Sequence, residues 1–194
     1  MAFSKGKRIE DETSTRIVDL AVNIGCREGY DALTVTRLCR ELNCDRRVVY
    51  NRFRDVDEIN LIVAERCNQE MIAGAKQTIV ESAPFFEKYQ AFIKNSFAYV
   101  YEKNTNFQYY TSLYQIEDGK IDNSIIDELT DFLEEGKKLG ELKDEVDCNM
   151  AAQNIWVLMV GFSSMLTKHV SYSYQIALDS LLLGISAIYH EIEK

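Results

Sequence analysis

Proline is almost absent from this chain: Pro84 is the only one among 194 residues, and there are nine glycines. Because proline interrupts helices and glycine weakens them, their scarcity favours long helices and an all-α fold. The composition, 46% hydrophobic and 27% charged, is typical of a globular protein. There is no apolar stretch of about eighteen residues and no apolar run after the charged N-terminus, so we expect neither a membrane span nor a signal peptide, and a cytoplasmic location.

Histidine and cysteine are also sparse, with two histidines, His169 and His190, and five cysteines that form no CxxC pair. Neither histidine has a cysteine or carboxylate at metal-ligand spacing, so no metal site and no cofactor are expected. An odd number of unpaired cysteines fits a reducing compartment. Four of them fall among apolar neighbours on predicted helices, which favours buried thiols; redox sensing by Cys44 is the alternative.

Motifs of catalysis are missing as well. The sequence contains no GxSxG, no phosphate-binding glycine loop, no histidine near a nucleophile and no carboxylate pair in an apolar setting. An enzyme is therefore not expected.

Charge is divided unevenly along the chain. The net charge is −9, yet residues 1–60 hold eleven basic and eleven acidic residues, so residues 61–194 carry the whole excess. All ten arginines lie at or before Arg66. Arginine suits paired hydrogen bonds to phosphate and guanine, so this pattern predicts a DNA-facing N-terminus and an acidic body. Chance clustering is the alternative.

The stretch 34–53 has the pattern of a helix-turn-helix. Thr34 is placed to cap a short helix with apolar residues at helical spacing, and Asn43 can adopt the left-handed conformation that ends it. Asp45 can cap a second helix over residues 46–53. The outer face of that second helix is polar and basic, which fits the major groove of DNA.

The polar positions of both helices are candidates for DNA contacts. Arg46 and Arg47 suit guanine or phosphate, and Asn51 suits an adenine edge or phosphate. Phosphates are also candidates for the remaining side chains, including those at the start of the first helix. The predicted DNA-binding residues are Thr34, Thr36, Arg37, Arg46, Arg47, Tyr50, Asn51 and Arg52.

Residues 17–59, about a fifth of the chain, resemble the DNA-binding region of the TetR (tetracycline repressor) family of bacterial regulators. The matching residues are Ile17, Ala21, Gly29, Tyr30, Thr34, Val35, Leu38, Tyr50, Phe53 and Ile59. The resemblance implies an N-terminal three-helix DNA-binding domain followed by a larger helical ligand-binding and dimerisation domain. It also implies a transcription regulator, usually a repressor, released from its palindromic operator by a small molecule. The chain departs from the family at Val56, where many members carry a phosphate-binding lysine.

The predicted domains are residues 1–60, which bind DNA, and residues 61–194, which bind ligand and dimerise. The first domain begins with a basic arm over residues 1–8 that fits either phosphate contacts or a solvated tail. A first helix is expected from about Ile9 to Arg27. Another helix, capped by Asp55 and running to about Val80, would join the domains, so that tilting one end moves the other.

Aromatic residues are concentrated between Phe85 and Tyr114, which hold eleven of the chain's twenty-one. Ser82 is placed to cap the helix that follows Pro84, and Asn104 divides the aromatic region into two helices. Many of these aromatics are tyrosines, which need partners when buried, and ligand cavities are typically apolar with a few polar groups. Packing residues of the core are the alternative. The predicted ligand-binding residues are Tyr89, Phe92, Tyr99, Phe107, Tyr110, Tyr114 and Trp156.

The last three predicted helices cover residues 122–139, 147–169 and 173–192. The apolar arcs of the final two are wider than one core needs, so we expect them to form a four-helix bundle with a second copy. A hairpin inside a monomer is the alternative. The expected partners are therefore an operator in double-stranded DNA, a second copy of the chain and an unidentified small molecule, with no membrane. The alternative function is a helical binding or adaptor protein that does not bind DNA.

Overall fold

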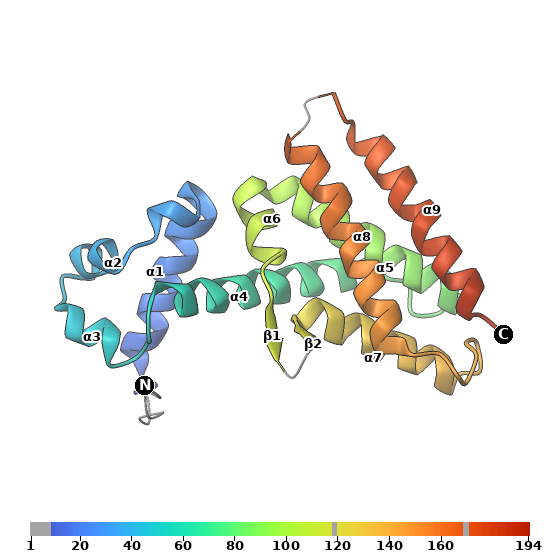
Figure 1. Cartoon of the computed structure of the whole chain (residues 1–194), viewed down its shortest axis with the longest axis horizontal. Coiled ribbons are helices and arrows are strands. Elements are labelled where there is room, and N and C mark those ends of the chain that lie inside the picture. Colours follow the sequence, from blue (N-terminus) through green and yellow to red (C-terminus); the bar gives the residue numbers. More distant parts are fainter. Residues whose placement is uncertain (1–8, 118–119, 169–170) are drawn as a thin grey trace.

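The computed structural model describes residues 9–117, 120–168 and 171–194. The all-α prediction is confirmed: helices form both parts of an elongated molecule, a small N-terminal unit and a larger C-terminal bundle, joined by α4 (Figure 1). The basic arm over residues 1–8 and His169 lie outside the described residues.

The N-terminal unit contains α1 (Glu12–Glu28), a short 3-10 turn η1 (Tyr30–Ala32), α2 (Val35–Leu42) and α3 (Arg46–Tyr50). The predicted caps of the helix-turn-helix are confirmed. The Thr34 hydroxyl accepts a hydrogen bond from the Arg37 amide, and the Asp45 carboxylate accepts one from the Arg47 amide. Asn43 ends α2 in the left-handed conformation, with φ 50°.

Two helix boundaries differ from the sequence prediction in this unit. The first helix begins at Glu12 rather than near Ile9, because Asp11 caps it through a reciprocal pair of hydrogen bonds with Ser14. The second helix of the helix-turn-helix ends at Tyr50 rather than Phe53. The amides of Arg52 and Phe53 both donate to the Val49 carbonyl in a final turn, which brings the Phe53 ring into the core.

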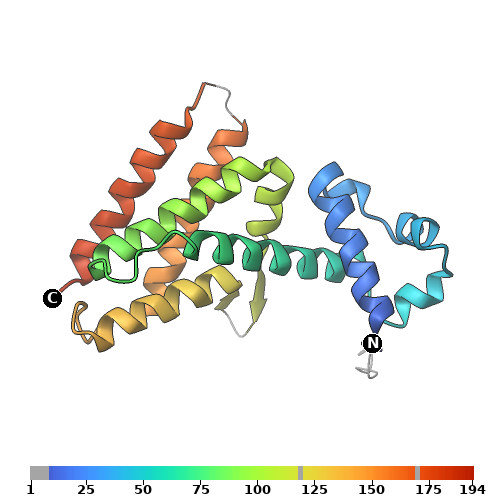
Figure 2. The ribbon, with the colours of Figure 1, turned by 180° about the vertical axis from the view of Figure 1, so that it is seen from behind.

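Helix α4 (Val56–Lys76) begins after the Asp55 cap and reaches from the N-terminal unit into the C-terminal bundle (Figure 2). It ends four residues before the predicted Val80. Its first half, including Ile59 and Val63, is buried against α1, and its second half, including Met71 and Ala75, is buried among the C-terminal helices. Both halves of α4 are therefore packed, one in each unit.

The C-terminal unit contains α5 (Phe85–Lys103), α6 (Thr105–Thr111), α7 (Ser124–Lys138), α8 (Cys148–Lys168) and α9 (Tyr174–Ile192). The break at Asn104 is confirmed, since its side chain accepts a hydrogen bond from the Phe107 amide and caps α6. The predicted Ser82 cap is wrong: Pro84 occupies the N-cap position of α5 and has no side chain to accept a hydrogen bond.

A two-stranded antiparallel hairpin, which the sequence did not predict, separates α6 from α7. Strand β1 (Gln115–Glu117) pairs with β2 (Lys120–Asp122), and Ile116 lies opposite Ile121. Three-residue strands are too short to give a period of their own, so their alternation is invisible in the sequence.

Helix α8 is long and apolar enough to cross a membrane by length and composition, with about a third of its most apolar window buried. It is the one helix of the described chain with that property. The same helix packs against α7 and α9 in the bundle, and core helices of globular proteins share this composition.

Candidate nucleic-acid interface and ligand cavity

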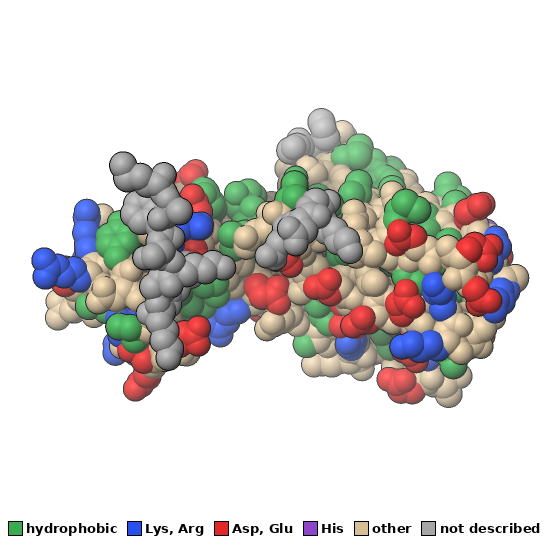
Figure 3. All heavy atoms as spheres, turned by 60° about the horizontal axis from the view of Figure 1, so that its bottom comes forward, with side chains coloured by type: hydrophobic (Ala, Val, Ile, Leu, Met, Phe, Trp, Pro, Cys, Tyr) green, Lys and Arg blue, Asp and Glu red, His purple; other side chains and the backbone are tan. Residues whose placement is uncertain are grey.

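Helices α2 and α3 form the end of the molecule farthest from the C-terminal bundle, and basic side chains gather there on the surface (Figure 3). This end is built on a small core. Leu38 of α2 and Val49 of α3 are buried against Ile17 and Ala21 of α1. Because Val49 of α3 lies in this core, the other side of α3, with Arg46, Arg47 and Tyr50, faces solvent.

The predicted base-reading residues lie on this exposed face. Arg46, Arg47, Tyr50 and Asn51 are all exposed, and the Tyr50 side chain keeps 53% of its accessible surface. A guanidinium nitrogen of Arg46 donates to the Thr36 hydroxyl at 2.9 Å, which links the start of α2 to the start of α3. Within the described part of the chain, the Arg47 guanidinium makes no hydrogen bond or ion pair.

Two predicted DNA-binding arginines are instead paired with carboxylates of the same chain. Arg37 donates two hydrogen bonds of 2.7 Å to the Glu28 carboxylate and one of 2.8 Å to Glu41. Arg52 donates to both carboxylate oxygens of Asp11 and to the Val48 carbonyl, and its side chain is only 11% exposed. These geometries favour a positioning role: Arg37 fastens α2 to the end of α1, and Arg52 fastens the end of α3 to the start of α1.

Val56 and Arg40 are two further positions that matter for DNA contacts at this end of the molecule. Val56, at the usual lysine position, is half-buried and packs against the hydrophobic core, so it offers no cation to a phosphate. Arg40 near the end of α2 is 74% exposed, with only a 3.8 Å approach to Glu41. Sequence reasoning missed Arg40; the available signal was a cation on the polar side of α2, just before the turn.

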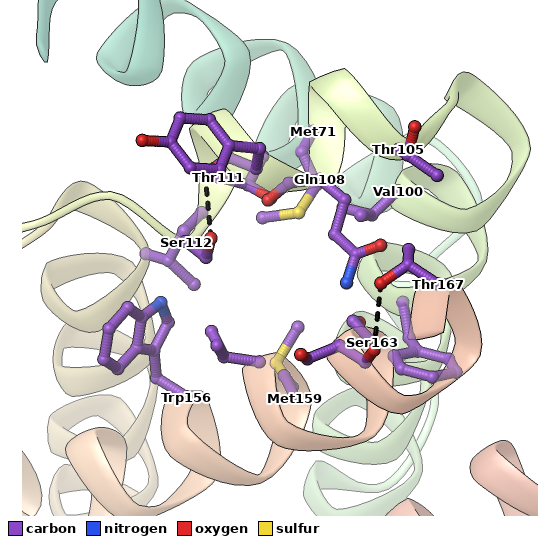
Figure 4. A pocket seen from close by; sticks show the side chains of 15 residues that line it. Met71, Val100, Thr105, Gln108, Thr111, Ser112, Trp156, Met159, Ser163 and Thr167 are labelled. Carbon is purple, nitrogen blue, oxygen red and sulfur yellow. Dashed lines mark hydrogen bonds between the residues drawn. The ribbon is translucent and has the colours of Figure 1, made fainter. Parts of the chain in front are cut away.

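A cavity of about 300 Å³ opens in the C-terminal unit between α4, α5, α6, α7 and α8. Figure 4 shows the Gln108 amide pointing into it from α6, with Met71 and Met159 on opposite sides and Trp156 at one end. The lining residues are Met71, Phe97, Val100, Thr105, Gln108, Tyr109, Thr111, Ser112, Ile125, Trp156, Met159, Val160, Ser163, Ser164 and Thr167.

The lining is mainly apolar and contains no Asp, Glu, Lys, Arg or His. Its polar side-chain groups are hydroxyls, the Gln108 amide and the Trp156 indole N–H, and Ser163 is buried on the inner face of α8. Hydroxyls and amides can donate and accept hydrogen bonds but cannot neutralise a buried charge. The cavity therefore suits an uncharged molecule with a few polar atoms.

Of the seven predicted ligand-binding residues, the structure places only Trp156 in the lining. Tyr114 stacks edge-on against Trp156, with ring centroids 5.6 Å apart, and is exposed. The Tyr110 hydroxyl donates to Asn60, and the Tyr99 hydroxyl donates to Glu70. The other three, Tyr89, Phe92 and Phe107, are buried. The structure therefore places these six residues outside the lining of this cavity.

The polar lining residues were missed by the sequence analysis. Ser163 and Thr167 are four residues apart, with Ser164 between them, in the mainly apolar second half of helix α8. These hydroxyls recur at helical spacing on the side of α8 that faces the core. That pattern could have predicted a polar cavity lining, but the aromatic cluster is the more obvious feature of the sequence.

Helix α6 connects the cavity with the N-terminal unit. Thr105, Gln108 and Thr111 line the cavity from one side of this helix. At its start, the side-chain amides of Asn104 and Asn106 both donate to the Cys26 carbonyl near the end of α1, at 3.2 and 3.5 Å. A molecule that pushed on α6 would therefore also move α1.

Comparison with known proteins agrees with this architecture, although no protein-family model matches the chain. An uncharacterised helix-turn-helix transcriptional regulator of Haemophilus influenzae is 26% identical over 115 residues, which cover 58% of this chain and 62% of that protein. The match thus spans less than two thirds of this curated relative.

Solved structures match over nearly the whole chain. A putative TetR-family regulator from Shewanella sp. PV-4 has a TM-score of 0.66 at 11% identity, covering 95% of this chain and all of that one. The regulator FadR from Bacillus subtilis, in complex with stearoyl-CoA, has a TM-score of 0.61 at 20% identity, covering 89% and 98%. The resemblance to the TetR family is confirmed, and this chain has the fold of the TetR-family transcription regulators.

Proposed function

We propose that this protein is a dimeric transcription regulator that binds a palindromic operator and is released from it by an uncharged small molecule. The observation that carries the proposal is the exposed face of α3. Arg46, Arg47, Tyr50 and Asn51 are exposed to solvent, on a helix that Val49 anchors in the core. A short, rigidly mounted helix with such a face fits the major groove.

Ion pairs within the chain hold the end of α3 and the neighbouring helix α2 against α1. Arg52 ties the end of α3 to α1, and Arg37 ties α2 to α1. In this proposal the DNA contacts come from Arg46, Arg47, Tyr50, Asn51 and Arg40, with Thr34 and Thr36 near the DNA backbone. Arg37 and Arg52 serve mainly to position α2 and α3.

The proposed dimer forms through α8 and α9. Both helices keep large apolar side chains exposed on their outer faces, and the Leu183 side chain retains 73% of its accessible surface. A methyl group added at Gly161 would meet nothing within 4 Å, so this part of α8 is open to close approach. The exposed apolar residues of the two helices are Met150, Val157, Met165, Ile176 and Leu183.

Covering these residues with a second copy would also account for the low burial of α8. The two copies of α8 and α9 would form a four-helix bundle whose two-fold axis relates the two α3 helices. Such a pair reads half-sites about one or a few helical turns apart, which is why the operator should be palindromic.

The proposed ligand site is the uncharged cavity beside α6. Binding there would act on α6, and α6 contacts both α4 and the Cys26 carbonyl of α1. Ligand affinity would therefore be coupled to the position of the N-terminal unit. Repression is the mode that the fold suggests, because occupancy that displaces α1 and α4 would separate or rotate the two α3 helices.

The proposal is tested by fluorescence anisotropy with the DNA upstream of the protein's own gene and a scrambled duplex of equal length. We expect affinity for the upstream DNA at least about a thousandfold above that for the scrambled duplex at physiological salt. Equal, weak binding to both would contradict the operator proposal.

The internal pairing of Arg37 and Arg52, together with Val56, favours a second candidate: an adaptor of the same fold that binds a protein instead of DNA. This candidate predicts no binding to any upstream duplex even at low salt, where non-specific DNA binding is strongest.

A further inference from the structure

We propose that Cys26 and Cys67 form a peroxide-reactive dithiol whose oxidation to a disulfide links α1 to α4. Their sulfur atoms are 3.5 Å apart, although 41 positions separate the two residues in the chain. A disulfide needs a sulfur separation of about 2.05 Å, so a local approach of roughly 1.5 Å would close the bond. The structure thus brings together two thiols that lie far apart in the chain.

The two thiols differ in ways that assign them different steps. Cys26 is half-buried, whereas Cys67 is 2% exposed. The Cys26 and Cys67 sulfurs share a hydrogen bond, which lowers the pKa of the Cys26 thiol against the effect of burial. The same hydrogen bond, with burial, raises the pKa of the Cys67 thiol. Since thiolates are the reactive form, Cys26 is the attacking sulfur.

The reaction then balances with hydrogen peroxide as the oxidant. The Cys26 thiolate attacks one peroxide oxygen, the O–O bond breaks, and the departing hydroxide takes up the proton that the thiol had released, leaving a sulfenic acid and one water. The Cys67 sulfur attacks the Cys26 sulfur, the S–S bond forms, and the sulfenic hydroxyl leaves with the Cys67 proton as a second water. Two thiols are oxidised and one peroxide is reduced.

A small oxidant can approach this pair. Cys26 is itself partly exposed, and a surface hollow lined by Val22, Arg66, Cys67, Gln69 and Glu70 reaches the Cys67 side of the pair. Two sulfurs are only half of a tetrahedral thiolate metal site, and no cluster of three or more His, Cys, Asp or Glu side chains in the described ranges completes one. Oxidation is therefore the chemistry that this pair favours over metal binding.

The bond would act at the junction of the two units. Cys26 lies near the end of α1, its carbonyl is held by α6, and Cys67 lies in the middle of α4. Drawing α1 toward α4 would carry α2 and α3 along, because Arg37 and Arg52 fasten them to α1. This consequence rests on the proposed function: the oxidised dimer would present its two α3 helices off their operator spacing and bind DNA more weakly.

The chemistry is tested on the full-length protein by counting free thiols and mapping peptides before and after treatment with hydrogen peroxide. We expect the five thiols to fall by two, with one Cys26–Cys67 disulfide that dithiothreitol reverses. Cys26→Ser and Cys67→Ser should each abolish the disulfide, and Cys148→Ser is the matched control that should keep it. In peroxide-treated Cys67→Ala, no second thiol can form the disulfide, so dimedone, which reacts with sulfenic acids, should label Cys26. This label identifies Cys26 as the attacking sulfur even if Cys67→Ser folds poorly.

A disulfide between Cys39 and Cys44 instead, or five unreacted thiols, would overturn the dithiol. Operator affinity is then measured in both redox states, with a loss of about fivefold or more expected on oxidation. Unchanged affinity after complete disulfide formation would overturn the regulatory role. If the disulfide forms but the reduced protein binds no operator, the proposed function fails while the dithiol stands.

Discussion

The guanidinium of Arg52 donates two hydrogen bonds to the carboxylate of Asp11, which joins the end of α3 to the N-cap residue of α1. One carboxylate thus serves both the first turn of α1, through the Ser14 amide, and the mounting of α3. Hydrogen bonds from Arg52, the largest cause, lower the pKa of Asp11 to about 2. The orientation of α3 therefore depends on a residue 41 positions earlier in the chain.

This pair predicts a pH dependence of stability. Because the folded-state pKa of Asp11 lies below its unfolded value of about 4, the stabilisation is fully present above pH 4 and is lost as pH falls toward 2. Arg52→Gln should lower the free energy of unfolding at pH 6, and this difference from the wild type should shrink as the pH falls from 4 to 3, toward the part that comes from the lost hydrogen bond to the Val48 carbonyl. Urea denaturation at pH 6, 5, 4 and 3 measures it. Arg40→Gln, on an exposed arginine, is the control, and an equal loss there would contradict the assignment.

Arg47 is the arginine of α3 best placed for DNA. Arg47→Ala should weaken operator binding about tenfold or more, and if the contact is to phosphate the slope of log affinity against log salt should fall by about one. Lys94→Ala removes one charge from the exposed side of α5 and should leave both quantities unchanged. Operator affinity of Arg47→Ala equal to that of the wild type would exclude Arg47 from the interface.

Arg52 gives a contrasting result in the same titration. If it positions α3, Arg52→Gln should weaken operator binding while leaving the salt slope close to that of the wild type, because no phosphate contact is lost. A slope reduced by about one would return Arg52 to the set of phosphate contacts expected from the sequence.

The dimer face is tested by placing a charge on it. Leu183→Glu should convert the dimer to a monomer at micromolar concentration, since an unpaired carboxylate cannot be buried cheaply between two apolar helices. Light scattering after size exclusion gives the mass. Leu139→Glu, at a comparably exposed leucine just after α7, is the control and should stay dimeric. A wild type that is monomeric at this concentration would refute the interface itself.

The contact between α1 and α6 is tested at Tyr110, which is fully buried and donates to the Asn60 side-chain oxygen at 3.1 Å. Tyr110→Phe leaves that oxygen unpaired and should cost about 1 to 3 kcal/mol of stability. Gly25→Ala should also destabilise the protein, by about 1 to 3 kcal/mol, because a methyl group there would lie 2.2 Å from the Tyr110 hydroxyl. Chemical denaturation checks both, and a Gly25→Ala variant as stable as wild type would show that Tyr110 can move aside.

The uncharged cavity predicts discrimination by charge. Trp156 is the only tryptophan and lines the cavity, so its fluorescence reports occupancy directly. We expect 1-decanol to change this fluorescence at concentrations where decanoate at pH 7.4 does not, because the cavity offers no cation to a carboxylate. Ser163→Phe should fill the space and abolish the response. Tighter binding of decanoate would contradict an uncharged ligand.

The sequence by itself determined the local structure of the N-terminal unit. Thr34, Asn43 and Asp45 act through hydrogen bonds and backbone angles within a few residues of each position, so their roles can be read without tertiary information. The apolar spacing of α1 and α4 likewise determined which of their faces are buried, since helical periodicity is a local property. The all-helical fold and the resemblance to the TetR family followed from these features.

Only the tertiary structure decided which of these side chains remain available. Arg37 and Arg52 look like DNA contacts in the sequence, but carboxylates from distant positions, Glu28 and Asp11, hold them. The same long-range packing placed hydroxyls beside Trp156 in the cavity lining, and set Cys26 beside Cys67. A sequence shows which kinds of group each side chain can bind, whereas the fold determines which of those groups lies within contact distance.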